Sequence, residues 1–212
     1  MIRRLAFFLA AATAACAAAP SPLERDLGQG LAYVRVKRLP ADLPAHSAGP
    51  ARPCVIDVRY TEADAVAATT FAAWLGFRAT PRAPMLVLAN TATSPALLDA
   101  LARPGARPSV IVIGAPGARF APDLAVSSTA AEERTAYDAL ENGAAPDTLL
   151  ADFPDKVRND EASLVRGQSG PGETPADAPP EGPAERRSAP VIDAALQRAV
   201  HLHRALVALR KL

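Results

Sequence analysis

Nitrogen bases are scarce in this 212-residue chain, because it contains only three histidines and three lysines. A Ser–His–acid triad would need one of the histidines to take the proton of a serine hydroxyl. His46 lies in a proline-rich stretch, while His201 and His203 lie near the C-terminal end, and their spacing to any serine gives a triad no support. We therefore interpret all three histidines as surface residues.

The same residues argue against a metal or redox centre. His201 and His203 are two positions apart, and side chains at i and i+2 of a helix point in different directions, so they would not share one ion. The two cysteines, Cys16 and Cys54, are too few for a zinc cluster or a multi-disulfide scaffold. We expect no metal and no cofactor. Cys54 is expected to be a small buried side chain in a strand, with a Cys16–Cys54 bridge as the alternative if Cys16 is retained unmodified.

Two short motifs have both a chemical and a structural interpretation. Asp57 and Arg59 could form an active-site pair or a buried ion pair at the end of a strand, and we favour the second. Gly114-Ala-Pro-Gly117 follows a predicted strand, as a phosphate-binding loop would. It lacks the lysine and the following serine or threonine of such a loop, so we interpret it as a turn.

Charge and composition limit the class of protein. The chain has 23 basic and 22 acidic residues and a formal net charge of +1, which argues against binding to nucleic acid through a basic surface. Half of its residues are hydrophobic, which is enough for one core of ordinary size.

Apolar runs alternate with segments of helical periodicity along the chain. The runs predicted to be strands are residues 31–37, 54–58, 85–89, 109–114 and 124–127, the first of them half-exposed because apolar and polar residues alternate in it. The predicted helices cover residues 61–76, 94–102, 130–141 and 191–211. This alternation predicts a single-domain α/β fold with a mainly parallel sheet of about four to six strands packed with helices.

Capping residues and apolar stripes define these helices. The first should begin at Thr61 as N-cap, with an apolar stripe formed by Val66, Phe71, Trp74 and Leu75. In the last helix, the stripe expected to pack on the domain comprises Ile192, Leu196, Ala199, Leu202, Leu206 and Leu209. Residues 167–190 are rich in proline and glycine and are predicted to be a disordered loop between this helix and an α/β domain at 24–166.

Residues 1–19 have the pattern of a signal peptide. Two arginines precede an apolar run of about 11 residues, which small residues follow, and this run is too short to span a membrane. Thr13-Ala-Ala-Cys16 is similar to a bacterial lipobox, which would make Cys16 a lipid attachment site; ordinary cleavage after Ala17 or Ala19 is the alternative. Either way the chain is predicted to be exported, to the periplasm or to a lipid-anchored position at the membrane.

Several motifs together resemble the tail-specific, or C-terminal processing, serine peptidases. The segments that match the family's strands and turns, in the family's order, are Gly30-Leu-Ala-Tyr-Val-Arg-Val, Val55-Ile-Asp-Val-Arg, Val87-Leu-Ala-Asn-Thr-Ala-Thr-Ser, Val112-Ile-Gly-Ala-Pro and Pro122-Asp-Leu-Ala-Val. Val191-Ile-Asp-Ala-Ala-Leu-Gln-Arg-Ala resembles the family's closing helix. The resemblance implies a crotonase-like, Clp-protease-like α/β core. The family's PDZ domain is not visible.

The resemblance also implies a serine–lysine dyad, with the lysine about 25 residues after the serine. Ser94 is the nearest match to the nucleophile, although Thr93 or Pro95 takes that place if the alignment slips by one residue. Arg119 then stands at the lysine position, and a guanidinium does not give up its proton in a protein. The family's Asn-Pro-Gly-Gly loop, whose backbone approaches the substrate, is replaced here by Tyr60 and the residues after it.

These departures lead to the functional expectation. We expect an exported, peptidase-like protein without proteolytic activity, which binds or helps to assemble other components of the bacterial cell envelope. Its partner would be another envelope protein or a peptide, not nucleic acid, and it would reach the membrane only through a lipid on Cys16. The alternative is an atypical serine hydrolase that uses Ser94 as nucleophile.

Overall fold

The structure is a computed structural model that describes residues 23–44, 51–102, 109–150 and 190–212. The predicted signal peptide with Cys16, and the predicted loop at 167–190 apart from Pro190, lie outside these ranges. In the described ranges, no helix combines the length and the apolar character needed to cross a membrane.

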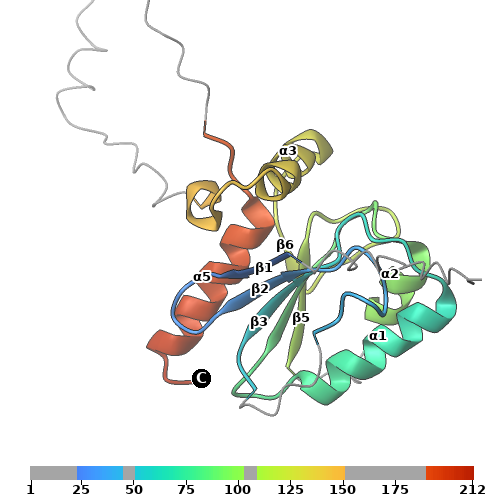
Figure 1. The fold of residues 1–212 in the computed structure, drawn as a ribbon, viewed down its shortest axis with the longest axis horizontal. Coiled ribbons are helices and arrows are strands. Elements are labelled where there is room, and N and C mark those ends of the chain that lie inside the picture. The colour runs from blue at the N-terminus through green and yellow to red at the C-terminus, as the bar shows by residue number, and fades with distance from the viewer. Residues whose placement is uncertain (1–22, 45–50, 103–108, 151–189) are drawn as a thin grey trace, which may run out of the picture.

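A six-stranded sheet forms the centre of the fold, and its strands lie in sequence order (Figure 1). They are β1 Leu23–Asp26, β2 Ala32–Arg35, β3 Cys54–Asp57, β4 Met85–Leu88, β5 Val110–Gly114 and β6 Leu124–Ala125. The strand β1 runs antiparallel to β2, and the other neighbours are parallel. The predicted α/β class and mainly parallel sheet are confirmed. Sequence reasoning missed β1, because three of its four residues are charged.

The connections between parallel strands pack on one face of the sheet. The helix α1, Ala65–Arg78, follows β3, and α2, Pro95–Ala102, follows β4. Leu39 and Leu43 from the β2–β3 connection and Phe120 from the β5–β6 connection join the same core as Phe71 and Leu97 of these helices. The chain therefore advances by one strand at each step, with its described connections on one side, as short right-handed crossovers allow.

This arrangement leaves the opposite face of the sheet to be covered by the end of the chain. The helix α5, Ala194–Ala208, lies across that face and buries Leu196, Ala199 and Val200 against Val55 and Leu86 (Figure 1). Beside it are α3, Ala130–Glu141, and the short 3₁₀-helix η1, Pro146–Leu149. Both faces of the central strands are thus buried, which explains their uninterrupted apolar sequences.

Two expectations about the first strand and helix were wrong. Residues 31–36 are buried throughout, whereas a half-exposed strand was predicted; Arg35 has no exposed surface because its guanidinium lies among polar partners between the sheet and α3. The helix α1 begins at Ala65 with Asp64 as N-cap, because the hydroxyl of Thr61 donates to the carbonyl of Val36 instead of capping.

Val66, placed in the predicted apolar stripe of that helix, is 75% exposed, while Phe71, Trp74 and Leu75 are buried as predicted. The predicted apolar stripe of α5 also includes residues that do not belong to its buried face. Its N-cap is Asp193, so Ile192 precedes the helix, and Leu209 lies outside the buried face.

His203, predicted at the surface, is buried and takes a place on the inner face of α5. Its Nε2 lies 3.1 Å from the carbonyl oxygen of Gln29 in the β1–β2 turn. Because the sequence did not predict β1, it did not predict the β1–β2 turn either. It therefore indicated no partner for His203.

Candidate functional site

Ser94, the predicted nucleophile, immediately precedes α2, just beyond the carboxyl end of β4. Its side chain is buried, its N–H donates to the carbonyl of Thr61 at 3.1 Å, and its carbonyl accepts from Leu98 at 3.1 Å. Within the described part of the chain, the Oγ atom has no hydrogen-bond partner. The structure therefore gives this hydroxyl no base to activate it.

Arg119, which the resemblance would place at the lysine position of the dyad, lies in the turn between β5 and β6. The turn is closed by hydrogen bonds between Gly117 and Phe120, at 2.9 and 3.1 Å, and Arg119 is exposed at its tip. Among the residues described, Arg119 forms no hydrogen bond or ion pair, either with Ser94 or with any other group. The structure does not bring these two predicted site residues together.

Several backbone N–H groups in the loops around Ser94, which could otherwise serve as oxyanion donors, already have acceptors. After β4, the N–H groups of Ala92 and Thr93 donate to the side-chain and main-chain oxygens of Asn90, at 3.1 and 3.0 Å. After β3, the N–H of Thr61 donates to Val58, and Tyr60 has a left-handed φ of +59°. A left-handed conformation costs a non-glycine residue about 1–2 kcal/mol, so surrounding contacts must hold Tyr60 in place.

A buried ion cluster, formed by Asp57, Arg59 and Asp193, fixes the carboxyl end of β3 to the N-terminus of α5. The Arg59 guanidinium donates to Asp57 Oδ2 at 2.7 Å and to Asp193 Oδ2 at 2.8 Å, and none of the three side chains is more than 1% exposed. Asp193 also caps α5 by accepting from the N–H of Leu196. The prediction of a buried strand-end ion pair is confirmed, with Asp193 as a partner that the sequence did not indicate.

Charge pairing sets the protonation states in this cluster. Burial alone would raise the pKa of Asp57, but the Arg59 guanidinium, together with Arg35 and the hydroxyl of Tyr33, holds that pKa below its ordinary value. Burial disfavours the Arg59 cation, yet Asp193 and Asp57 raise its pKa well above the ordinary value. Asp57 and Arg59 are therefore both charged over the physiological range, and their contacts with Asp193 dock α5.

Polar side chains from β2 and α3 extend this cluster. The hydroxyl of Tyr33 donates to Asp57 Oδ2 at 2.7 Å, and Arg35 donates to that hydroxyl and to the carbonyl of Tyr137. The Arg35 guanidinium lies 3.7 Å from the centre of the Tyr137 ring, a cation–π contact. Burial raises the pKa of Tyr137 to about 12, so its hydroxyl stays protonated.

Glu133 of α3 is a buried acid at this edge that forms no ion pair with a described residue. It is 7% exposed, and its Oε2 accepts from Asn90 Nδ2 at 3.4 Å, a long contact. Its Oε1 is buried with no hydrogen-bond partner in the described residues. Burial raises the pKa of Glu133. Beside it, the Tyr60 ring packs edge-on against Tyr137 at 4.9 Å, with the Arg134 guanidinium 4.8 Å above Tyr60.

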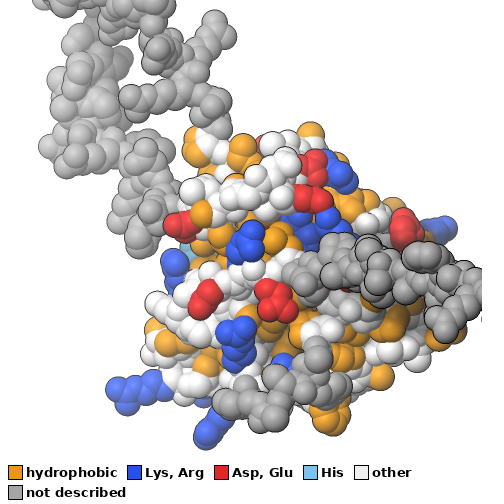
Figure 2. Space-filling model, viewed as in Figure 1, with side chains coloured by type: hydrophobic (Ala, Val, Ile, Leu, Met, Phe, Trp, Pro, Cys, Tyr) orange, Lys and Arg blue, Asp and Glu red, His pale blue; other side chains and the backbone are white. Residues whose placement is uncertain are grey.

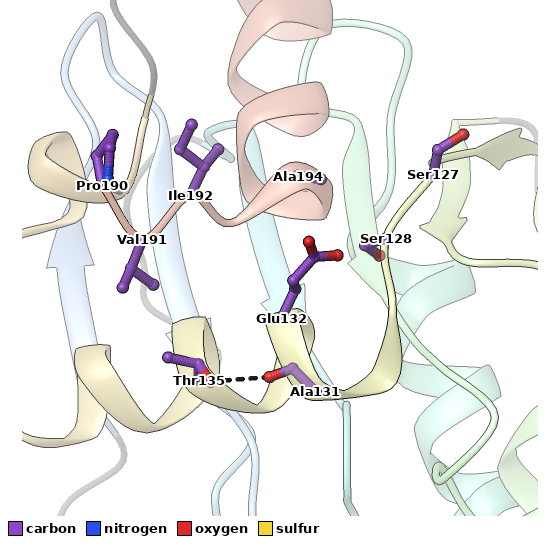
Figure 3. A pocket seen from close by; sticks show the side chains of 9 residues that line it. All are labelled: Ser127, Ser128, Ala131, Glu132, Thr135, Pro190, Val191, Ile192 and Ala194. Atoms are coloured by element: carbon purple, nitrogen blue, oxygen red, sulfur yellow. Dashed lines mark hydrogen bonds between the residues drawn. The ribbon is translucent and has the colours of Figure 1, made fainter. Parts of the chain in front are cut away.

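A surface groove of about 510 Å³ lies between α3 and the segment that leads into α5 (Figure 3). One wall is α3, the other is residues 190–194, and the chain leaving β6 closes one end. The residues that line it are Ser127, Ser128, Ala131, Glu132, Thr135, Pro190, Val191, Ile192 and Ala194. Its volume lies within the range of small-ligand and peptide sites.

The groove continues from the outer edge of the sheet. The N–H of Val126 donates inward to Gly114 at 3.0 Å, so by strand alternation the backbone groups of Ala125 and Ser127 point away from the sheet. These outward groups form no hydrogen bonds with other described residues. An edge of this kind can accept an added extended chain.

The face of the molecule seen in Figure 2 shows no large patch of one charge. Acidic and basic side chains are interspersed where described residues are visible in Figure 2. No group of three or more histidine, cysteine, aspartate or glutamate side chains within the described ranges is arranged to hold a metal ion. Cys54 is a buried free thiol whose pKa is raised to about 12 by burial, so it is chemically inert, as expected for a strand residue.

Comparisons with known proteins leave the chain without a family assignment. No protein-family model matches it, and no curated protein does so either.

Sequence reasoning missed Glu133, Tyr60 and Asp193 for different reasons. Glu133 lies in a helix rich in surface charge, and nothing in the sequence distinguishes it from the exposed Glu132 beside it. The conformation of Tyr60 follows from the turn, and the role of Asp193 depends on a contact across 134 residues. A signal did exist for Asp193, since it stands three residues before Leu196 at the start of an apolar helix, as an N-cap does.

Proposed function

We propose that this chain is an exported, non-catalytic binding protein of the bacterial cell envelope, with a core similar to that of the tail-specific peptidases of the crotonase-like and Clp-protease-like group. The order of the matched motifs supports the similarity, because the segments that resemble the family's strands fall on β2, β3, β4, β5 and β6, which are adjacent in the sheet. The signal-peptide pattern of residues 1–19 supports export.

The environment of Ser94 is the observation that carries the non-catalytic part of the proposal. A serine nucleophile needs a base in hydrogen-bond reach and donors for the oxyanion. Here the hydroxyl is buried with no hydrogen-bond partner among the described residues, the residue at the proposed lysine position is an exposed arginine, and the nearby N–H groups of Ala92 and Thr93 are already bonded.

The groove between α3 and residues 190–194 is the surface we propose for binding. It combines the apolar side chains of Val191 and Ile192, each 38% exposed, with the hydroxyls of Ser127, Ser128 and Thr135, and it adjoins an unpaired backbone edge. An extended peptide segment of a partner protein could pair with this edge and place alternate side chains in the groove.

A fluorophosphonate probe tests the absence of catalysis. Purified protein and the Ser94→Ala variant should show the same background labelling, with denatured protein as a control for nonspecific reaction. Labelling of the folded protein that Ser94→Ala abolishes would overturn the proposal in favour of the alternative, an atypical serine hydrolase.

Photo-crosslinking in the cell envelope tests the binding surface. A photoreactive amino acid at Thr135, in the groove, should capture a discrete partner, while the same amino acid at Val66, exposed on the opposite side of the sheet, should not. Ile192→Asp should reduce capture at Thr135. Equal capture from both positions would reject the groove as the binding surface.

Export has its own test. Incorporation of radiolabelled palmitate that Cys16→Ser abolishes is expected if the lipobox is used. A mature N-terminus at Ala18 would instead establish ordinary cleavage, and full-length protein in the cytoplasm would reject export.

A further inference from the structure

We propose that Glu133 is a protonation-dependent latch that holds α3 against the carboxyl edge of the sheet and so controls one wall of the groove. The role of the groove in this statement rests on the proposed function, but the latch itself concerns only the docking of α3.

The position of Glu133 is the first argument. Its neighbours in the sequence, Glu132 and Arg134, have exposed side chains that bond to Thr129 and Asp138, whereas Glu133 points into the molecule and is 7% exposed. The one hydrogen bond of its side chain with a described residue is the 3.4 Å contact from Asn90 to Oε2, and Oε1 has none. A buried carboxylate with so few donors is costly, whereas a protonated carboxyl group in the same place is much less so.

Charge balance at this edge is the second argument. In the interior, the Arg59 guanidinium pairs with the carboxylates of both Asp57 and Asp193, while Arg35 lies 3.6 Å from Glu141. At the surface, Lys37 pairs with Glu141. An ionised Glu133 would be a third carboxylate near the Arg59 guanidinium, which already pairs with Asp57 and Asp193.

The groups that face Glu133 come from three elements. Asp57 and Arg59 lie at the end of β3 with Tyr60 next to them, Asn90 follows β4, and Asp193 caps α5. Burial raises the pKa of the Glu133 carboxyl; Arg59 and Asn90 oppose this rise, while Asp193 and Asp57 reinforce it.

The raised pKa of Glu133 determines how the docking of α3 changes with pH. Below the ordinary pKa of 4.5, Glu133 carries its proton whether α3 is docked or not, and ionisation costs nothing. As the pH rises above that value, an undocked α3 releases the proton more readily than a docked one. Docking therefore weakens progressively until the pH passes the raised pKa of the docked state.

Weaker docking of α3 would also alter the groove, because this helix forms one of its walls. Ala131, Glu132 and Thr135 of α3 form one wall, so a looser α3 changes the shape of the groove. Ala136, Tyr137 and Leu140 remain buried anchors, which limits the change to partial loosening. The groove should be best formed at acid pH.

Amide hydrogen exchange across pH tests the latch. Protection factors, corrected for the intrinsic pH dependence of exchange, would be measured for residues 134–140 of α3 and for α1 as an internal reference. In the wild-type protein, α3 protection relative to α1 should fall between about pH 4 and pH 8, by at most roughly tenfold for each pH unit of the interval between the two pKa values. Glu133→Gln should remove this dependence, whereas Glu132→Gln should retain it.

Two outcomes would overturn the proposal: a wild-type α3 whose protection does not change with pH, or the same change in Glu133→Gln. If Glu133→Gln does not fold, the carboxyl carbon of Glu133 can be titrated by NMR in the wild-type protein. A midpoint at or below the ordinary value would then reject the latch. Neither measurement uses a partner, so failure of the crosslinking test would reject the binding role and leave the latch standing.

Discussion

Two acidic side chains at the carboxyl edge of the sheet, Asp57 and Glu133, are both buried, yet their surroundings act on them in opposite directions. Asp57 lies against Arg59 and receives a hydrogen bond from Tyr33, so its pKa falls despite full burial. Glu133 has a single long bond from an amide, so burial prevails and its pKa rises. The comparison teaches that the available donors, not the depth of burial, decide which acid is a fixed structural charge and which can respond to pH.

The largest effect on the contrast between Asp57 and Glu133 is expected from removal of Arg59, the cation that pairs with both Asp57 and Asp193. Arg59→Met would leave Asp57 and Asp193 as unpaired buried carboxylates, and we expect a loss of about 3–5 kcal/mol in the free energy of unfolding. Urea denaturation measures this loss. Arg134→Met, which breaks an exposed ion pair, is the matched control and should cost less than about 1 kcal/mol. A comparable loss in both variants would show that the buried cluster does not anchor α5.

A second test compares neighbouring hydroxyls in the loop after β4. Thr93→Ala removes the bond to the carbonyl of Val58 and the acceptor for the N–H of Asn90, and should cost about 1–3 kcal/mol. Ser94→Ala removes no hydrogen bond among described residues and should change stability by less than about 1 kcal/mol. Urea unfolding of both variants decides this, and a larger loss in Ser94→Ala would mean that its hydroxyl has a partner.

The opposite pKa shifts predict opposite limbs of the pH–stability curve. Because the pKa of Asp57 is lowered, its contribution is present above its ordinary value of 3.8 and is lost as the pH falls through the native value. Because the pKa of Glu133 is raised, stability declines as the pH rises above 4.5. Thermal unfolding over pH should therefore show Glu133→Gln gaining stability at neutral pH and matching wild type at acid pH. A gain that is independent of pH would contradict this reasoning.

The smallest effect is expected at the surface turn between β5 and β6. Arg119→Lys introduces the lysine that the proposed similarity to the peptidases would call for, but the side chain starts from the exposed tip of the turn and has no contact with Ser94. We expect no change in fluorophosphonate labelling and almost none in the urea midpoint. New labelling that depends on Ser94 would show that the turn can reach the serine.

Much of the fold could be predicted because its signals are local. Continuous apolar runs located β3, β4 and β5, and the Ser94–Pro95 pair located the start of α2. The predicted bounds of α3, residues 130–141, agree with the structure, where Thr129 and Glu132 form a capping box at its start. The start of α1 was misplaced because Thr61 and Asp64 are both good N-caps, and only a carbonyl 25 residues away decides between them.

The sequence by itself determined the α/β class, the pairing of Asp57 with Arg59 and the absence of any lysine between Lys37 and Lys156, because each depends on residue type and short-range spacing. Tertiary structure alone decided that Asp193 completes the ion cluster, that His203 is buried, that Ser94 and Arg119 stay apart and that Glu133 forms no ion pair with a described residue. These features depend on which residues meet across the sheet, since burial and the supply of hydrogen-bond donors are properties of the packed molecule.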